Sequence, residues 1–496
     1  MVWFRKAMIL THRYLGIALC LPIVVWFVSG IGMMYAGGMP RLTPETRLER
    51  LPPLDLARVR LSPSEAAERG NMTPTPGRLV LTTIMNRPAY RFDRGSFSVV
   101  FADTGDVMPD VAAPEAMTIA SRFMHLPEES LHPAGVLTEP DQWTIGQADQ
   151  MPLHKFTVDD AAATQLYVSA PLGEVSVHTT RGTRALAWVA AIPHWLFLVE
   201  LRRHGDLWRQ LVMWTSGLAA ISAVIGLVLA VTQFSPATPF RLNRLGASIP
   251  YVGLMRWHYI TGAIFGIFTV TWLFSGMMSL EPFEWASGGG SGRGMRNALA
   301  GGELDVARFP RVDAAAWEEA LPGRVPKEMD LLLIQGEPYY AARGVESKPV
   351  LVAADPLRIR REPFSIESLM DRVKQGNPGV PIVESQVLPE FDSYYYERGQ
   401  AATLPVLRVK FGDPDRTWFY IDPGTSRVVE QLTWRARLNR WVFFGLHTLD
   451  FSFWYYTPLW DIGVIALSIG GGASAAIGMF IGFKRLKRNA RRIAVR

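Results

Sequence analysis

The sequence has 496 residues, a formal net charge of +6 and 49% hydrophobic residues, which gather in separate stretches along the chain. This length exceeds one soluble core of ordinary size, and the clustering is typical of membrane spans separated by soluble segments. The single cysteine, Cys20, excludes an intrachain disulfide, a cysteine-ligated iron–sulfur cluster and a covalent c-type haem. A redox metal in this chain would therefore need histidine or oxygen ligands.

Four stretches of about 22 residues are apolar enough to cross a hydrocarbon core of about 30 Å. They are Tyr14–Tyr35, Leu211–Val231, Tyr259–Leu280 and Ile462–Phe483. A fifth apolar stretch, Ala185–Leu201, is followed by Arg202 and Arg203, and we interpret it as an interfacial or re-entrant helix. The sequence thus predicts a protein with four membrane spans, and the lipid bilayer is one of its expected partners.

Basic residues gather at the start of the chain, between spans two and three, and after span four. The three clusters are Arg5, Lys6 and Arg13; Arg241, Arg244 and Arg256; and Lys484, Arg485, Lys487, Arg488, Arg491, Arg492 and Arg496. Because positive residues stay on the cytoplasmic side, we expect both termini in the cytoplasm of a bacterium. The protein would be a multi-pass protein of the inner membrane, with both long segments in the periplasm.

The two halves of the chain align with each other, which predicts two tandem repeats. The matched pairs include His12 with His258, Gly16 with Gly262, Trp26 with Trp272, Ser29 with Ser275, Gly30 with Gly276, His194 with His447, Ser222 with Ser474 and Gly226 with Gly478. Both repeats have the same orientation in the membrane, so a pseudo-two-fold axis should run along the membrane normal.

Each long segment has strand and helix patterns that indicate a periplasmic α+β domain. The expected strands are Arg78–Ile84, Ala89–Phe92, Phe97–Phe101, Gln165–Ser169 and Val175–Thr179, then Leu331–Ile334, Tyr339–Ala342, Pro349–Ala353, Leu404–Phe411 and Thr417–Ile421. The expected helices are Ser62–Arg69, Ala113–Met124, Ala314–Ala320 and Ile366–Lys374, and the Gly- and Ser-rich Ala286–Met295 should be a linker.

The chain accordingly divides into alternating membrane and soluble parts. Repeat A has span one (1–35), periplasmic domain A (36–184), and the interfacial helix with span two (185–231). A cytoplasmic link (232–256) follows. Repeat B has span three (257–280), periplasmic domain B (281–440), and an interfacial segment with span four (441–483), before the basic cytoplasmic tail (484–496).

Four of the nine histidines coincide when the halves are superposed. They are His12 with His258 at the cytoplasmic boundary and His194 with His447 at the outer boundary; His125, His132, His154, His178 and His204 have no such match. Across a pseudo-two-fold axis, equivalent imidazoles face each other, which suits the two axial positions of a haem iron. The sequence predicts these four histidines as haem-binding iron ligands, without indicating a catalytic residue.

Other residues near the pairs support this hypothesis. Gly16 and Gly262 follow the inner histidines by four residues, so their missing side chains leave room for a flat macrocycle on the same helix face. Candidates to pair with haem propionates are Arg13, Arg256, Arg203 and Arg440. Asp450 is a candidate to orient His447.

Simpler interpretations stay open for each feature. Boundary histidines often cap helices or reach the interface, and zinc is a rival metal, although no third ligand clusters with either pair. Trp26 and Trp272 lie mid-span and serve packing or electron transfer. Gly30, Gly276, Gly226 and Gly478 are interpreted as points of close helix approach.

The ordered motifs resemble the PepSY-associated transmembrane family. A boundary His-x-x-x-Gly is followed by a span ending Trp-x-x-Ser-Gly, an insert with features such as Arg87–Val107 and Thr417–Thr425, and a His segment such as Ala191–Trp195 or Gly445–Asp450. This family includes siderophore reductases of the inner membrane that bind two b haems. The resemblance implies PepSY-like periplasmic domains, two b haems on His12, His258, His194 and His447, and outward electron transfer to a periplasmic ferric chelate.

The expected function is therefore electron transfer by a haem b protein, an oxidoreductase of the ferric-siderophore reductase type. The chain has no dinucleotide-binding motif, so a quinol or a cytoplasmic reductase must donate the electrons, and no nucleic-acid partner is expected. Two rival functions remain: a non-enzymatic PepSY-type binding or regulatory module anchored in the membrane, and a component of iron or siderophore transport.

Overall fold

The structure is a computed structural model that describes residues 2–494, except 73–76, 94, 96, 235–248, 250, 287–291, 347, 398–401, 452 and 456. The chain forms two compact units, each built from segments far apart in the sequence. The helical unit comprises Met1–Met39, Thr183–Gly288 and Arg435–Arg496, and the sheet unit comprises Pro40–Gly182 and Gly289–Trp434. Arg241, Arg244, Arg496 and half of the predicted Gly- and Ser-rich linker lie outside the described residues.

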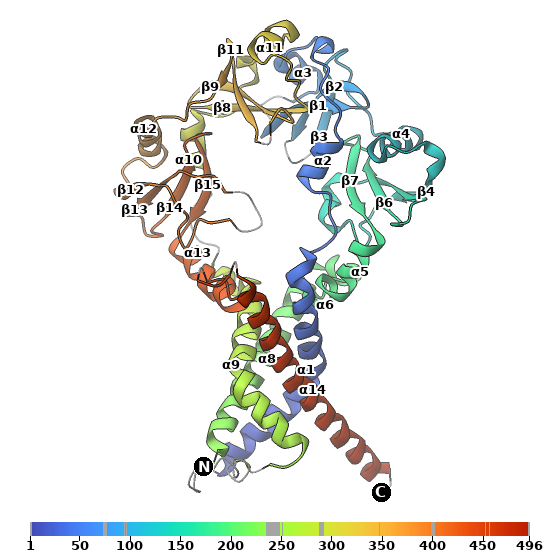
Figure 1. Ribbon diagram of the computed structural model, residues 1–496, viewed down its shortest axis with the longest axis vertical. Coiled ribbons are helices and arrows are strands. Elements are labelled where there is room, and N and C mark those ends of the chain that lie inside the picture. Colours follow the sequence, from blue (N-terminus) through green and yellow to red (C-terminus); the bar gives the residue numbers. More distant parts are fainter. Residues whose placement is uncertain are drawn as a thin grey trace. The chain divides into compact units, whose positions relative to one another are not determined.

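Among the described residues, four helices of the helical unit are long and apolar enough to cross a membrane. They are α1 (Val2–Ala36), α8 (Gly205–Gln233), α9 (Leu254–Met278) and α14 (Pro458–Ala494). They pack side by side as a bundle (Figure 1). Even α9, with 25 residues, is about 37 Å long at 1.5 Å per residue. Three of the predicted spans lie inside these helices. The remaining one, Tyr259–Leu280, ends two residues beyond α9.

Apolar side chains cover the outside of the bundle as well as its interior. Leu21, Ile264 and Ile469 are 60%, 59% and 60% exposed, as expected for helices that lipid surrounds. Inside, small residues let the helices approach closely: a Cβ atom at Gly471 of α14 would collide with the ring of Phe27 on α1.

Short helices precede the second and fourth long helices. Ala185–Leu201, expected as one interfacial helix, falls in α5 (Arg181–Val189), α6 (Ala191–Trp195) and α7 (Val199–Arg202). Non-helical backbone at Ala190 separates α5 from α6, and left-handed Leu196 ends α6. In the second half, α13 (Trp434–Asn439) leads into a π-helix, η7 (Arg440–Gly445). The segment therefore turns repeatedly, and α6 and η7 place His194 and His447 at the bundle.

The sheet unit contains helices and strands from both long segments. The first segment provides α2 (Pro44–Arg50), α3 (Pro63–Arg69), β1 (Arg78–Ile84), β2 (Arg87–Asp93), β3 (Phe97–Phe101), α4 (Ala113–Met124), β4 (Leu131–Leu137), β5 (Leu153–Val158), β6 (Gln165–Ser169) and β7 (Glu174–Thr179). The second provides α10 (Arg293–Ala300), α11 (Ala314–Ala320), β8 (Glu328–Ile334), β9 (Glu337–Arg343), β10 (Val350–Ala354), β11 (Leu357–Arg360), α12 (Ile366–Gly376), β12 (Ile382–Leu388), β13 (Val406–Phe411), β14 (Trp418–Asp422) and β15 (Arg427–Leu432).

These strands form three antiparallel sheets. One sheet of seven strands, in the order β11-β10-β9-β8-β1-β2-β3, joins the two segments, because β1 pairs with β8 and sets Leu79 opposite Leu331. Each segment also forms its own sheet of four consecutive strands, β4–β7 or β12–β15. One apolar core therefore contains residues of both segments, including Tyr90 and Trp317.

An ion-pair cluster spans the two segments of the sheet unit. Arg47 of α2 contacts Glu174 of β7 at 2.9 Å and Glu328 of β8 at 2.8 Å, and Arg91 of β2 contacts Glu174 at 2.6 Å. Glu328 is almost fully buried, with a side chain 3% exposed. Mutually compensating charges allow this burial.

Candidate functional site

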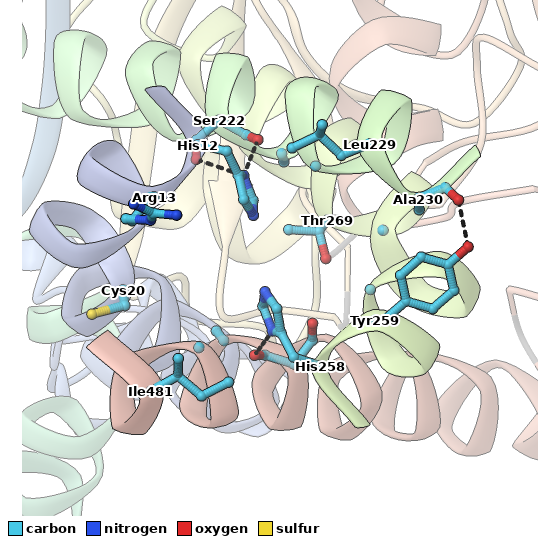
Figure 2. A pocket seen from close by; sticks show the side chains of 18 of the residues that line it. His12, Arg13, Cys20, Ser222, Leu229, Ala230, His258, Tyr259, Thr269 and Ile481 are labelled. Carbon is cyan, nitrogen blue, oxygen red and sulfur yellow. Dashed lines mark hydrogen bonds between the residues drawn. The ribbon is translucent and has the colours of Figure 1, made fainter. Parts of the chain in front are cut away.

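The inner pair of histidines meets inside the bundle. His12 projects from α1 and His258 from α9, and their ring centroids lie 6.2 Å apart with an interplanar angle of 27°. Figure 2 shows the two imidazoles pointing at one another across a pocket. A metal binds an imidazole nitrogen at about 2.0 Å, so two imidazoles on opposite sides of one metal have centroids about 6 Å apart. The observed separation fits that geometry.

Backbone carbonyl groups fix the orientation of both inner rings. His12 Nδ1 lies 2.9 Å from the carbonyl oxygen of Ser222 on α8, and His258 Nδ1 lies 3.0 Å from that of Ser474 on α14. A carbonyl only accepts hydrogen bonds, so each Nδ1 carries the proton and donates it. Each Nε2 then keeps a free lone pair, the form that ligates metals. Within the described part of the chain, neither Nε2 makes a hydrogen bond.

Glycines on the neighbouring helices make room for the inner rings. A Cβ atom at Gly226 would lie 2.8 Å from His12 Cε1, and one at Gly478 would lie 3.0 Å from His258 Cε1. The sequence-based interpretation of these glycines as points of close helix approach is therefore incomplete, because they form the surfaces on which the imidazoles rest.

A cavity of about 290 Å³ surrounds the inner pair, close to the lower end of ligand pockets at about 300 Å³. Its walls are mainly apolar and come from all four long helices. Gly16 lines it, and a Cβ atom there would meet nothing within 4 Å, so the space beside His12 is open. Gly262, the matched glycine, also lines it. A Cβ atom at Gly262 would lie 3.6 Å from Ser474 Oγ, so the open space is at Gly16.

The outer pair of histidines meets near the opposite end of α1. His194 of α6 and His447, which follows η7, have ring centroids 6.0 Å apart and an interplanar angle of 63°. His447 also stacks on Phe443 at 5.2 Å. Burial lowers the pKa of His194 to about 4, and burial together with the neighbouring His194 lowers the pKa of His447 to about 3. Both rings are thus neutral at physiological pH, as metal ligation requires.

At the outer pair, serine hydroxyl groups lie beside the imidazoles together with the backbone carbonyls of Trp26 and Trp272. Ser29 Oγ lies 3.2 Å from His194 Nδ1, and Ser275 Oγ lies 3.0 Å from His447 Nδ1. Each hydroxyl donates to a carbonyl of its own helix, that of Trp26 or Trp272, and so accepts from the imidazole. The Nε2 atoms of this pair are again the free nitrogens among the described residues.

The outer rings also rest on glycines. A Cβ atom at Gly30 would lie 3.5 Å from His194 Cε1, and one at Gly276 would lie 3.6 Å from His447 Cε1. The two pairs are well separated. His12 and Ser29 are 17 residues apart on α1, as are His258 and Ser275 on α9, which corresponds to about 25 Å.

The four arginines expected near the pairs have different surroundings. Arg13 lines the inner cavity. Arg256 donates to the carbonyl of Tyr251, and Arg203 contacts Glu200 at 3.6 Å. Buried Arg440 contacts the Asp450 carboxylate at 3.4 Å. Arg13 is therefore the one that the structure brings into the cavity.

One further expectation about the outer pair needs correction. Asp450 contacts Arg440, and the Nδ1 of His447 donates to the Ser275 hydroxyl instead. Trp26 and Trp272 lie between the two pairs, three residues before Ser29 and Ser275 and so closer to the outer pair.

Both sites are pairs rather than larger clusters. Over the described ranges, no group of three or more His, Cys, Asp or Glu side chains converges as a metal site. Of the unmatched histidines, His132 pairs with Asp159 and His154 donates to the carbonyl of Val111, both in the sheet unit. Two facing imidazoles suit a metal whose remaining ligands come from a cofactor.

No family model matches this sequence, and no curated protein is significantly similar to it.

Proposed function

We propose that this chain is a membrane electron carrier that binds two b haems, one between His12 and His258 and one between His194 and His447. The observation that carries the proposal is the pairing itself. Both pairs have centroids about 6 Å apart, the separation expected on either side of one metal ion, and all four rings have Nδ1 bonded and Nε2 free.

The residues around the inner pair fit a haem. The cavity is largely apolar, and the open space at Gly16 lies on the same helix face as His12. When bound, haem b supplies an iron that accepts and releases one electron at a time between the ferric and ferrous forms. The protein contributes axial nitrogen ligands of fixed orientation, and its apolar walls exclude water from the site.

Equivalent contacts in the two halves support the tandem duplication. His12, Ser222 and Gly226 form one set of contacts, and the matched His258, Ser474 and Gly478 form another with nearly the same distances. The antiparallel pairing of β1 with β8, which are matched strands, is consistent with a two-fold relation in the sheet unit. We therefore retain the resemblance to the PepSY-associated transmembrane family as part of the proposal.

We place the chain in a bacterial inner membrane, with the basic ends of α1 and α14 in the cytoplasm. The pair of His12 and His258 then lies near the cytoplasmic face, and the pair of His194 and His447 lies near the periplasmic face. Electrons enter at the inner pair from a quinol or a cytoplasmic reductase and leave from the outer pair. The acceptor is a periplasmic ferric chelate, in which one electron reduces one ferric ion to the ferrous ion.

A reoxidation experiment tests this function. The purified full chain is reduced with dithionite, freed of excess reductant and mixed anaerobically with a ferric hydroxamate chelate. We expect the sharp ferrous bands to decay as one ferrous ion forms per electron. The matched gallium chelate has the same shape but accepts no electron, so it should leave the spectrum unchanged. A colourless protein, or equal decay with gallium, would contradict the proposal.

A further inference from the structure

The inner cavity differs in charge between its two sides. Arg13 of α1 and Arg485 of α14 line it on one side, and Tyr259 of α9 and Gln233 of α8 line it as well. Figure 2 shows Arg13 and Tyr259 on opposite sides of the histidine pair. In the alignment of the halves, Tyr259 matches Arg13 and Gln233 matches Arg485. Each repeat therefore has one cationic position, Arg13 or Arg485, whose match in the other repeat is neutral.

The two arginines lie at the same level of the bundle. Positions 471 and 482 of α14 adjoin Phe27 and Ile17 of α1, so residue numbers rise along α14 as they fall along α1 and the helices are antiparallel. Arg485 is one turn beyond Gly482, and Arg13 is one turn before Ile17. Both residues therefore line the cavity from facing turns of two helices.

Neither arginine has a partner in the described part of the chain. No hydrogen bond or ion pair involves the guanidinium of Arg13 or Arg485. At the matched positions, by contrast, Tyr259 donates to the carbonyl of Ala230, and Tyr251 donates to Gln233. Both arginines are only partly buried, and their guanidinium groups are available to pair with an acidic ligand in the cavity.

We propose that Arg13 and Arg485 bind the oxyanion groups of the ligand that occupies the inner cavity. A ligand with acidic groups along one edge is thereby held with that edge toward α1 and α14, and its apolar edge toward Tyr259. This inference rests on the proposed function in one respect: haem b has two propionate carboxylates on one edge, and arginine pairs well with carboxylates. A phospholipid phosphate has the same chemistry and is the other possible source.

Binding of haem and of its dimethyl ester, which lacks free carboxylates, tests the proposal. The experiment uses the full chain with the substitutions His194→Ala and His447→Ala, so that only the inner cavity binds the added compound. We expect haem to bind roughly 100-fold more tightly than the ester, since each charge-assisted contact contributes about tenfold. Arg13→Gln or Arg485→Gln should each weaken haem binding about tenfold, and the double variant should bind haem and ester equally. Arg488→Gln, an exposed neighbour on α14, is the matched control and should change neither affinity.

If the double variant still binds haem more tightly than the ester, the proposed carboxylate site is overturned. A chain that binds neither compound would instead contradict the proposed function, and native mass spectrometry then decides the anion site. Anionic phospholipid retained by the parent chain and lost from the double variant would assign Arg13 and Arg485 to a lipid phosphate. Equal retention, or no retained lipid, would overturn the anion site altogether.

Discussion

The imidazole of His12 rests on the backbone of Gly226, so closely that a Cβ atom there would lie 2.8 Å from His12 Cε1. The ring cannot retreat freely, because its Nδ1 is bonded to the carbonyl of Ser222, one turn earlier on the same helix. One turn of α8 therefore holds the ring by both a hydrogen bond and a contact. Preorganised ligands of this kind bind metals with little loss of side-chain freedom.

Gly226→Ala should displace the His12 ring and remove the inner haem. The added methyl group enters the space that the imidazole occupies, so the ring must move by several tenths of an ångström or more. We expect haem content to fall by about one per chain, with the helical content unchanged. Gly205→Ala on the same helix is the control, because a Cβ atom there meets nothing within 4 Å. Full haem content in Gly226→Ala would show that the ring position is not critical.

Ser275→Ala and Ser474→Ala should differ, although both serines lie beside a histidine. At His447, alanine removes the Ser275 hydroxyl that bonds Nδ1 and leaves only the Trp272 carbonyl; at His258 the Nδ1 partner is the Ser474 carbonyl, which alanine keeps. Loss of such a partner typically weakens metal binding about 10–100-fold. Competition with a haem-binding acceptor protein measures haem retention. Equal retention in the two variants would contradict the assigned hydrogen bonds.

Gly16→Leu should fill the inner cavity without unfolding the bundle. A side chain at this position enters open space, so the fold gains apolar contacts instead of strain. We expect a melting temperature equal to or above that of the parent chain and haem content lower by about one per chain. Unchanged haem content would place the cofactor elsewhere.

The ion-pair cluster of the sheet unit should make unfolding depend on pH. Burial raises the pKa of the Glu174 carboxyl, but Arg91 and Arg47 outweigh burial, and the pKa lies below its ordinary value of 4.5. The folded state therefore gains stability from ionised Glu174 above about pH 4.5, and loses it as pH falls through the lower folded pKa. Glu174→Gln should cost about 3 kcal/mol at pH 7 and flatten this dependence. Urea unfolding at several pH values, followed by the β-sheet signal, measures the free energy of unfolding and its dependence on pH. The same pH dependence in the variant as in the parent chain would contradict the assignment.

The long helices and the histidine pairs could be anticipated because their signals are strong in the sequence. Twenty apolar residues in a row admit few structures, and His12 and His194 stand out because their matches, His258 and His447, are also histidines. Strands that contain aromatic or β-branched runs, such as β1, β3 and β14, were also predicted. Periodicity and internal matching were sufficient for these features.

Other features depend on contacts that no local pattern records. β4 contains Pro133 and Gly135, and β12 alternates apolar and polar residues only weakly, so neither was predicted. The matched serines were seen in the sequence, but their roles depend on which atom, hydroxyl or carbonyl, faces the imidazole. Arg485 was grouped with the basic tail, and its place beside Arg13 follows only from the antiparallel packing of α14 against α1.

A pyridine haemochrome assay on the purified full chain tests the central claim most directly. We expect two b haems per chain in the parent protein. One should remain when His12 and His258 are replaced by alanine, one when His194 and His447 are replaced, and none when all four are. Haem content that does not follow the two pairs in this way, or that is zero in the parent protein, would contradict the account.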